Sequence, residues 1–284
     1  MNACQQTRNR LATFVALAME KAPKPYYKIM NPNMRNRNVQ YVVGLNEYDK
    51  EISNNGHDGF HLCTERNISY WLRLYRNPVV SVAYLCPESV VRKGARKLRT
   101  NRCILETPVP IREFLRTQNC AEYLMDDGLL LEYMDTQTPE LCMLAVKQNG
   151  RALQFVKEPN EDIVRAAVLQ NARALEYVTN PSRDVCMLAV RQNGLALRYV
   201  DPKNRDKSIC MMAVHNNGYA IQYVPDSLRI SYICEIALAQ NGYALQFLKK
   251  QTPTLCQIAL SQNPLAKIFV KIPLPKPADL GSHT

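Results

Sequence analysis

One pattern recurs seven times between about residues 120 and 270 of this 284-residue chain. Each copy reads approximately Leu-Cys-x-x-Ala-Val-x-Gln-Asn-Gly, then x-Ala-Leu-x-Tyr-Val, followed by a link that often contains proline. Aligned on the asparagine, the copies fall at Asp127, Asn149, Asn171, Asn193, Asn217, Asn241 and Asn263, which are 22 or 24 residues apart. A fixed period of this length predicts a solenoid, in which the recurring residues mainly hold neighbouring units together.

The unit around Asn149 predicts two short helices. Thr138 and Pro139 are typical of a helix start, since a hydroxyl caps the first turn and proline fits within it. Four apolar residues form one helical stripe, namely Leu141, Cys142, Ala145 and Val146. We expect Gly150 to end this helix in the left-handed conformation, and residues 152–156 to form a second helix. Helices of about ten residues are marginal alone, so stacking must bury their shared face.

Each recurring position has a structural interpretation. The position four residues before the asparagine is Ala145, Ala167, Ala189, Ala213, Ala237 and Ala259, which allows close helix packing. The aromatic position is Tyr133, Phe155, Tyr177, Tyr199, Tyr223, Phe247 and Phe269. A nucleic-acid stacking platform is the alternative for these rings, but we favour packing because the repeats carry almost no net charge. The asparagines, and the glutamines beside them, are expected to bond freed backbone groups at the turns.

Six of the ten cysteines occupy one register position of the repeat: Cys120, Cys142, Cys186, Cys210, Cys234 and Cys256. Val164 fills the same position in the remaining unit, so the position is interpreted as a small buried apolar site. The other four cysteines form no CxxC pair. This usage predicts a reduced, intracellular protein rather than a disulfide framework.

The net charge of +11 is unevenly distributed. Residues 1–117 carry 19 Lys and Arg against 9 Asp and Glu, whereas residues 118–284 carry 17 against 16. This asymmetry predicts two domains with different surfaces. No apolar run approaches the roughly 20 residues needed to span a bilayer.

We therefore predict four segments. Residues 1–23 form an amphipathic helix or arm, residues 24–115 a small basic α+β module, residues 116–271 an all-α solenoid of about seven two-helix repeats, and residues 272–284 a proline-rich flexible tail. Within the module, residues 39–45, 59–63 and 79–85 read as strands and residues 67–75 as a helix.

The module holds one cluster with metal or nucleophile potential, formed by His57, His61 and Cys63. His61 and Cys63 would share one face of a strand. A zinc site needs three or four ligands, however, and the sequence offers no further ligand nearby. Turn and core roles are favoured, and we expect no catalytic residue, metal or cofactor.

Two sets of residues are candidates for partner binding. The run from residue 92 to 102 contains six basic residues, namely Arg92, Lys93, Arg96, Lys97, Arg99 and Arg102. Contact with nucleic acid, an anionic membrane or an acidic protein is one interpretation, and a solvated surface is the other. On the repeats, variable positions expected to face a protein partner are Lys147, Arg151, Arg191, Arg198, His215 and Tyr219.

Both halves of the chain resemble known families. Residues 138–156 resemble short helical repeats of unassigned function that are abundant in giant DNA viruses of amoebae and occur in some amoeba-associated bacteria. Residues 27–31, 39–46 and 59–68 are similar to the module that precedes many giant-virus ankyrin-repeat proteins. The chain departs from that pattern by lacking ankyrin repeats and by having Phe60-His61-Leu62 where those proteins tend to have Leu-Tyr-Phe.

The resemblance implies a non-enzymatic scaffold or protein-interaction protein of a giant virus. A minor capsid-associated virion component and a host-directed infection factor remain open, in the virion or the infected host cytoplasm. The alternative is an ADP-ribosyltransferase-like enzyme, because Gly59-Phe60-His61 resembles the glycine-aromatic strand of that family. The partner's identity and the oligomeric state stay open.

Overall fold

The computed structural model describes residues 25–36, 39–50, 52, 58–86 and 89–273. The chain divides into two compact units, Met1–Thr136 and Gln137–Thr284. The sequence placed the boundary between residues 115 and 116, whereas the first helix pair of the repeat belongs to the first unit. The expected N-terminal arm and most of the expected tail lie outside the described residues.

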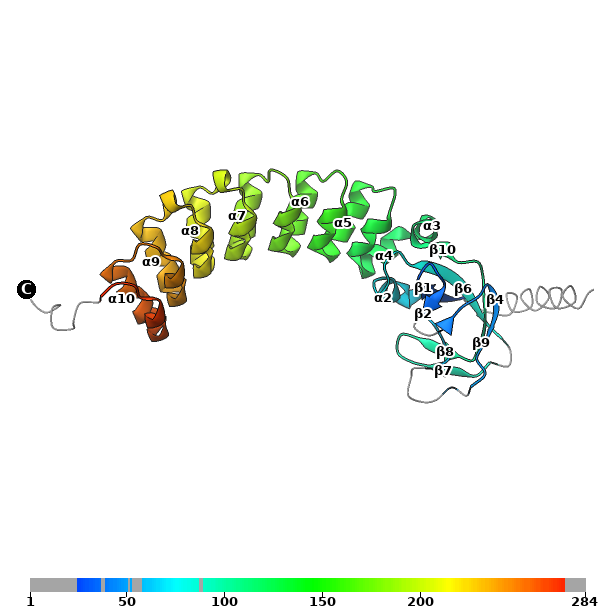
Figure 1. Cartoon of the computed structure of the whole chain (residues 1–284). Coiled ribbons are helices and arrows are strands. Elements are labelled where there is room, and N and C mark those ends of the chain that lie inside the picture. The colour runs from blue at the N-terminus through cyan, green and yellow to red at the C-terminus, as the bar shows by residue number, and fades with distance from the viewer. Residues whose placement is uncertain (1–24, 37–38, 51, 53–57, 87–88, 274–284) are drawn as a thin grey trace, which may run out of the picture. The chain divides into compact units, whose positions relative to one another are not determined.

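The first unit is built on antiparallel sheets (Figure 1). The largest sheet runs in the order β1 (Tyr26–Met30), β6 (Val79–Leu85), β9 (Arg102–Leu105) and β4 (Gly44–Glu47), and β10 (Val109–Pro110) also pairs with β6. A second sheet runs β5 (Phe60–Leu62), β8 (Leu98–Thr100) and β7 (Val91–Lys93), and β2 (Arg35–Asn36) pairs with β3 (Val39–Gln40). The described residues of this unit also form the helices η1 (Glu65–Asn67), α2 (Ile68–Leu72), α3 (Ile111–Arg116), α4 (Cys120–Asp126) and η2 (Gly128–Tyr133).

The strands expected at residues 59–63 and 79–85 are confirmed as β5 and β6. The single strand expected at residues 39–45 is wrong, because the chain turns between β3 and β4. Gly44 has a φ of 96°, and the Asn46 side chain accepts from Val42 N at 3.0 Å and donates to Val42 O at 2.9 Å. The helix expected at residues 67–75 is confined to α2 and is preceded by the 3₁₀ turn η1.

The second unit consists of six pairs, each an α-helix of ten residues followed by a 3₁₀ helix of six. The pairs are α5 (Pro139–Gln148) with η3 (Gly150–Phe155), α6 (Glu161–Gln170) with η4 (Ala172–Tyr177), α7 (Arg183–Gln192) with η5 (Gly194–Tyr199), α8 (Lys207–Asn216) with η7 (Gly218–Tyr223), α9 (Ser231–Gln240) with η9 (Gly242–Phe247), and α10 (Pro253–Gln262) with η10 (Pro264–Phe269). With α4 and η2, the described residues contain the seven expected pairs. The two 24-residue units use their longer links for the 3₁₀ turns η6 (Pro202–Asn204) and η8 (Asp226–Leu228).

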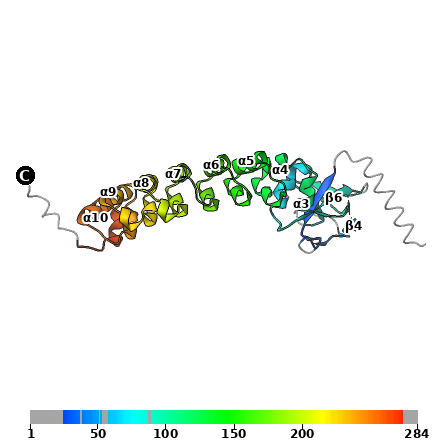
Figure 2. The same cartoon turned by 90° about the horizontal axis from the view of Figure 1, so that it is seen from above.

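Successive pairs of the second unit pack in chain order. Each α-helix contacts the next α-helix, and each 3₁₀ helix contacts the next 3₁₀ helix. Figure 2 accordingly shows the α-helices in one row and the 3₁₀ helices in a second row beside it. The recurring alanines and the register cysteines from Cys142 onward are buried in this packing, as their small size predicts.

Polar side chains cap both helices of each pair in the second unit except at α9, where Ile230 holds the N-cap position and makes no side-chain cap. Thr138 Oγ1 accepts from Leu141 N at 3.3 Å, which confirms the expected start of α5. Asn149 Oδ1 accepts from Arg151 N at 3.1 Å, so the asparagine caps the following 3₁₀ helix. The turn role expected for this asparagine is therefore confirmed, and the second helix of the pair is of the tighter 3₁₀ type.

The expected left-handed conformation of Gly150 is wrong. Asn149 is extended, with a φ of −148°, and Gly150 simply opens the 3₁₀ helix. Glycine is required there because an added Cβ would lie 2.4 Å from Ala167 O of the next repeat. The equivalent contact at Gly194 would be 2.2 Å from Ala213 O. Close approach between repeats, rather than backbone handedness, explains these glycines.

A second contact fixes the same junctions, and we call it the amide bridge. At four junctions the side chain at the end of the α-helix accepts from the glycine N–H of the preceding repeat: Gln170 from Gly150 at 2.6 Å, Asn216 from Gly194 at 2.7 Å, Gln240 from Gly218 at 2.5 Å and Gln262 from Gly242 at 2.5 Å. The junction between α6 and α7 differs, since Ala172 stands in the glycine position. The Gln192 amide donates there to Leu169 O at 2.8 Å, as Asn216 also donates to Arg191 O at 2.9 Å.

In three links of the second unit, the residue directly before the α-helix N-cap joins two neighbouring 3₁₀ helices. Arg205 donates to Val200 O at 2.8 Å and to Tyr223 O at 2.6 Å, and so joins the ends of η5 and η7. Arg229 joins η7 to η9 and Gln251 joins η9 to η10 in the same way. Pro159 and Pro181 occupy this position in two repeats, and their rings have no donor for such a bond.

Replacing Gly194 with alanine is expected to lower the free energy of unfolding by about 1–3 kcal/mol, because the new methyl group must push two repeats apart. The matched control is Ala172→Gly, which exchanges the same residues at the same register and should cost no more than about 1 kcal/mol. Urea unfolding of the full chain, followed by circular dichroism, measures both. A Gly194→Ala protein as stable as wild type would contradict the close-approach explanation.

Candidate functional sites

The predicted partner-binding residues of the repeats fall into three register rows. Lys147, Arg191 and His215 lie two residues before the asparagine and are all exposed. The same row contains Leu169, Ala239 and Ser261, also exposed, so its chemistry changes from one repeat to the next. The row follows the C-terminal ends of the α-helices.

The other three residues lie on the 3₁₀ helices. Arg151 is exposed directly after its glycine. Tyr219 has the same register but is half-buried, because its ring packs edge-to-face on Phe247 of the next repeat at 5.9 Å. Arg198 is exposed and places its guanidinium 5.1 Å from the Tyr199 ring. The aromatic position itself is half-buried in every repeat, so the rings pack between repeats and also reach the surface.

The basic run 92–102 folds into the β7–β8 hairpin and the start of β9, and its side chains differ in exposure and in ion pairing. Arg99 is buried and pairs with Asp58 at 2.6 Å, and Arg102 pairs with Glu47 at 2.9 Å. Arg92, Lys93 and Arg96 are exposed, and Lys97 is half-buried. The hairpin therefore presents a smaller free positive surface than the sequence suggests.

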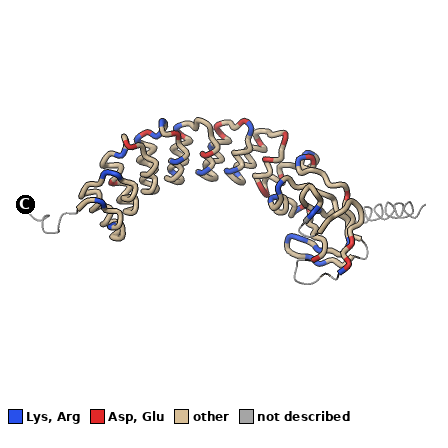
Figure 3. The backbone as a smooth tube through the Cα atoms, in the orientation of Figure 1, with Lys and Arg blue, Asp and Glu red and all other residues tan. Residues whose placement is uncertain are grey.

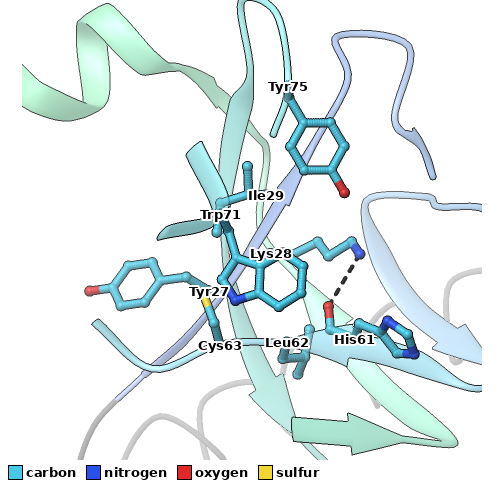
Figure 4. Close-up of a pocket in the computed structure, with 8 residues that line it drawn as sticks. All are labelled: Tyr27, Lys28, Ile29, His61, Leu62, Cys63, Trp71 and Tyr75. Carbon is cyan, nitrogen blue, oxygen red and sulfur yellow. Dashed lines mark hydrogen bonds between the residues drawn. The ribbon is translucent and has the colours of Figure 1, made fainter. Parts of the chain in front are cut away.

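A small cavity of about 20 Å³ lies between β1, β5 and α2 (Figure 4). It is lined by Tyr27, Lys28, Ile29, His61, Leu62, Cys63, Trp71 and Tyr75. A space of this size holds about one water molecule. His61 and Cys63, which the sequence paired, point to different sides of it in Figure 4, and His57 lies outside the described residues.

Lys28 is the unexpected residue of this site. Its side chain is only 2% exposed, and its Nζ donates to His61 O at 3.2 Å and lies 4.3 Å from the centre of the Tyr41 ring. Burial disfavours the charged amine and lowers the pKa of Lys28 to about 7. Lys28 is the only charged residue of a strand that reads Tyr-Tyr-Lys-Ile-Met, and this isolation was the one available sequence signal.

The neighbouring groups are held neutral. Burial, together with the charges of Lys97, Lys28 and Arg99, lowers the pKa of His61 to about 4. Burial raises the pKa of the Cys63 thiol to about 12, so this thiol is a poor nucleophile near neutral pH. Among the described residues, no three His, Cys, Asp or Glu side chains gather as a metal site.

Comparison with known proteins adds a match on the repeats. A family model described as a domain of unknown function, DUF4116, matches residues 138–181 and again residues 182–229. Each match begins at a helix cap, Thr138 or Ser182, and spans two repeats of the chain. No curated protein and no solved structure matches the chain. Within the described residues, no helix is long and apolar enough to cross a membrane.

The pKa of Lys28 predicts a pH-dependent stability. The unfolded chain keeps this proton up to about pH 10.5, whereas the folded amine loses it above about pH 7. Between these values the unfolded state binds more protons, so the contribution of Lys28 to stability rises with pH, by up to about 1.4 kcal/mol per unit. Lys28→Met should flatten the slope between pH 7 and 9 in urea unfolding, whereas Lys93→Met, an exposed control, should keep it. Parallel slopes in all three proteins would refute a neutral Lys28.

Proposed function

We propose that the chain is a non-enzymatic protein-interaction protein in which the helical repeats form a solenoid that binds a protein partner. The observation that carries the proposal is that the recurring residues are taken up by contacts among the repeats themselves. The glycines, the capping asparagines and the amides at the helix ends all bond within the repeats or between them. What remains for recognition is the row of exposed residues that vary between repeats.

The row of Lys147, Leu169, Arg191, His215, Ala239 and Ser261 suits a protein partner. It mixes cationic, apolar and small side chains, all exposed, on consecutive α-helices. A phosphate backbone would instead favour a continuous run of Lys and Arg. Charges of both signs are spread over this unit in Figure 3.

We further propose a giant-virus protein that acts in the virion or in the infected host cytoplasm. This rests on the resemblance of residues 138–156 and of the N-terminal stretches. Recovery of the chain at fixed stoichiometry from purified particles would support a virion component. Its absence from particles would favour a host-directed factor.

Charge reversal on the variable row tests partner binding. In cross-linking mass spectrometry of cells that produce the full chain, a partner should cross-link to residues near this row. Lys147→Glu with Arg191→Glu should reduce its recovery about tenfold, as expected when two interfacial charges are reversed. The control pair Lys207→Glu with Lys250→Glu changes the net charge equally at exposed positions outside the row. Equal recovery from both double variants would overturn the proposed binding row.

A further inference from the structure

A polar pocket of about 240 Å³ lies in the first unit, away from the Lys28 cavity. It is lined by Arg66, Asn67, Ser69, Tyr70, Arg73, Arg96, Asp126 and Asp127. The three arginines come from η1, from the end of α2 and from the turn between β7 and β8. Arg66 and Arg96, which are 30 positions apart in the sequence, thus line the same pocket.

Tyr70 holds two of these arginines in place. The Arg96 guanidinium carbon lies 4.4 Å from the centre of the Tyr70 ring, and that of Arg73 lies 4.7 Å from it. The backbone at Arg96 is also anchored, because its carbonyl accepts from the Trp71 indole at 2.9 Å. Stacking on a ring restrains a guanidinium while its N–H groups stay available in the guanidinium plane.

The charges around this pocket favour an anion. Within the described residues, none of the three guanidinium groups forms an ion pair. Two carboxylates face the same space, and both accept hydrogen bonds: Asp126 from Ser69 Oγ at 3.2 Å and Asp127 from Leu129 N at 3.1 Å. The lining still carries one net positive charge, and its arginines are exposed enough to meet a ligand from solvent.

We propose that this pocket binds a phosphate group, either as the free anion or as a phosphate monoester with its ester side in solvent. A carboxylate ligand is satisfied by one guanidinium fork, whereas a tetrahedral dianion has oxygens for three. Asn67 also lines the pocket, and its amide, which donates one N–H to Thr64 Oγ1 at 3.1 Å, has a second N–H to offer. The volume exceeds the roughly 30 Å³ share of one water several times over, which leaves room for a phosphate group.

The test is a titration of the full chain with inorganic phosphate and with a phosphoserine peptide, followed by ³¹P NMR at an ionic strength of about 0.15 M. Arg66→Gln, Arg73→Gln and Arg96→Gln together should weaken binding at least about tenfold, because charge-assisted hydrogen bonds are lost. The control triple variant is Arg35→Gln, Arg92→Gln and Lys93→Gln, which removes the same charge from exposed positions of the same unit and should bind within about twofold, since screened surface charges act weakly.

Tyr70 provides a test without any change of charge. Tyr70→Leu removes the ring under the arginines and should weaken binding about threefold or more, whereas Tyr70→Phe keeps the ring and should bind as wild type. Far-ultraviolet circular dichroism and thermal unfolding monitor the fold of every variant. Tighter binding of the peptide than of inorganic phosphate identifies the monoester as the ligand, and equal binding identifies the free anion.

Three results would overturn the proposal. Equal losses in the two triple variants would mean a diffuse basic surface. Unchanged binding in a folded Tyr70→Leu protein would mean that phosphate binds away from the arginines that stack on this ring. Failure of wild type to bind either probe would leave no phosphate site.

Discussion

The second unit depends on the approach of one repeat's glycine to the helix end of the next repeat. At Gly150 the space for a Cβ is occupied by Ala167 O, and the glycine N–H donates to Gln170 Oε1. The two contacts belong to one arrangement, because the amide reaches the N–H only when the backbones are this close. A buried N–H without a partner is costly, so the glycine and the glutamine of successive repeats are required together.

This coupling explains what the sequence could predict and what it could not. The period, the helix starts and the buried cysteine register follow from spacing and residue size alone. The role of Gly150 does not, because glycine satisfies both a left-handed turn and a close approach, and a single sequence carries no information on which neighbour lies 2.4 Å away. The same limit applies to Lys28 and to the arginines around Tyr70, whose surroundings come from residues distant in the chain.

In the first unit, the number of basic residues in a stretch of sequence does not show where positive charge gathers on the folded surface. The basic run 92–102 reads as one patch, but its residues meet different neighbours in the fold. Arg99 lies on β8, whose three residues are all buried, and pairs with Asp58, while Arg96 lies in the turn before β8 and stacks on the Tyr70 ring. The residues that gather positive charge are therefore those that tertiary contacts bring together, and they include Arg66 and Arg73 from outside the run.

The junction between α6 and α7 shows how the repeats tolerate departures from their pattern. Ala172 replaces the glycine, and Pro181 replaces the bridging side chain of the link, directly after Asn180 with its positive φ of 53°. Ser182 Oγ compensates in part by donating to Glu161 Oε1 at 3.2 Å. In a stack where stability is the sum of neighbouring junctions, such a junction lowers cooperativity locally without unfolding the rest. Local unfolding of the repeats should therefore begin at the junction between α6 and α7. This would separate the repeats before residue 180 from those after it, and it would divide the variable row between Leu169 and Arg191.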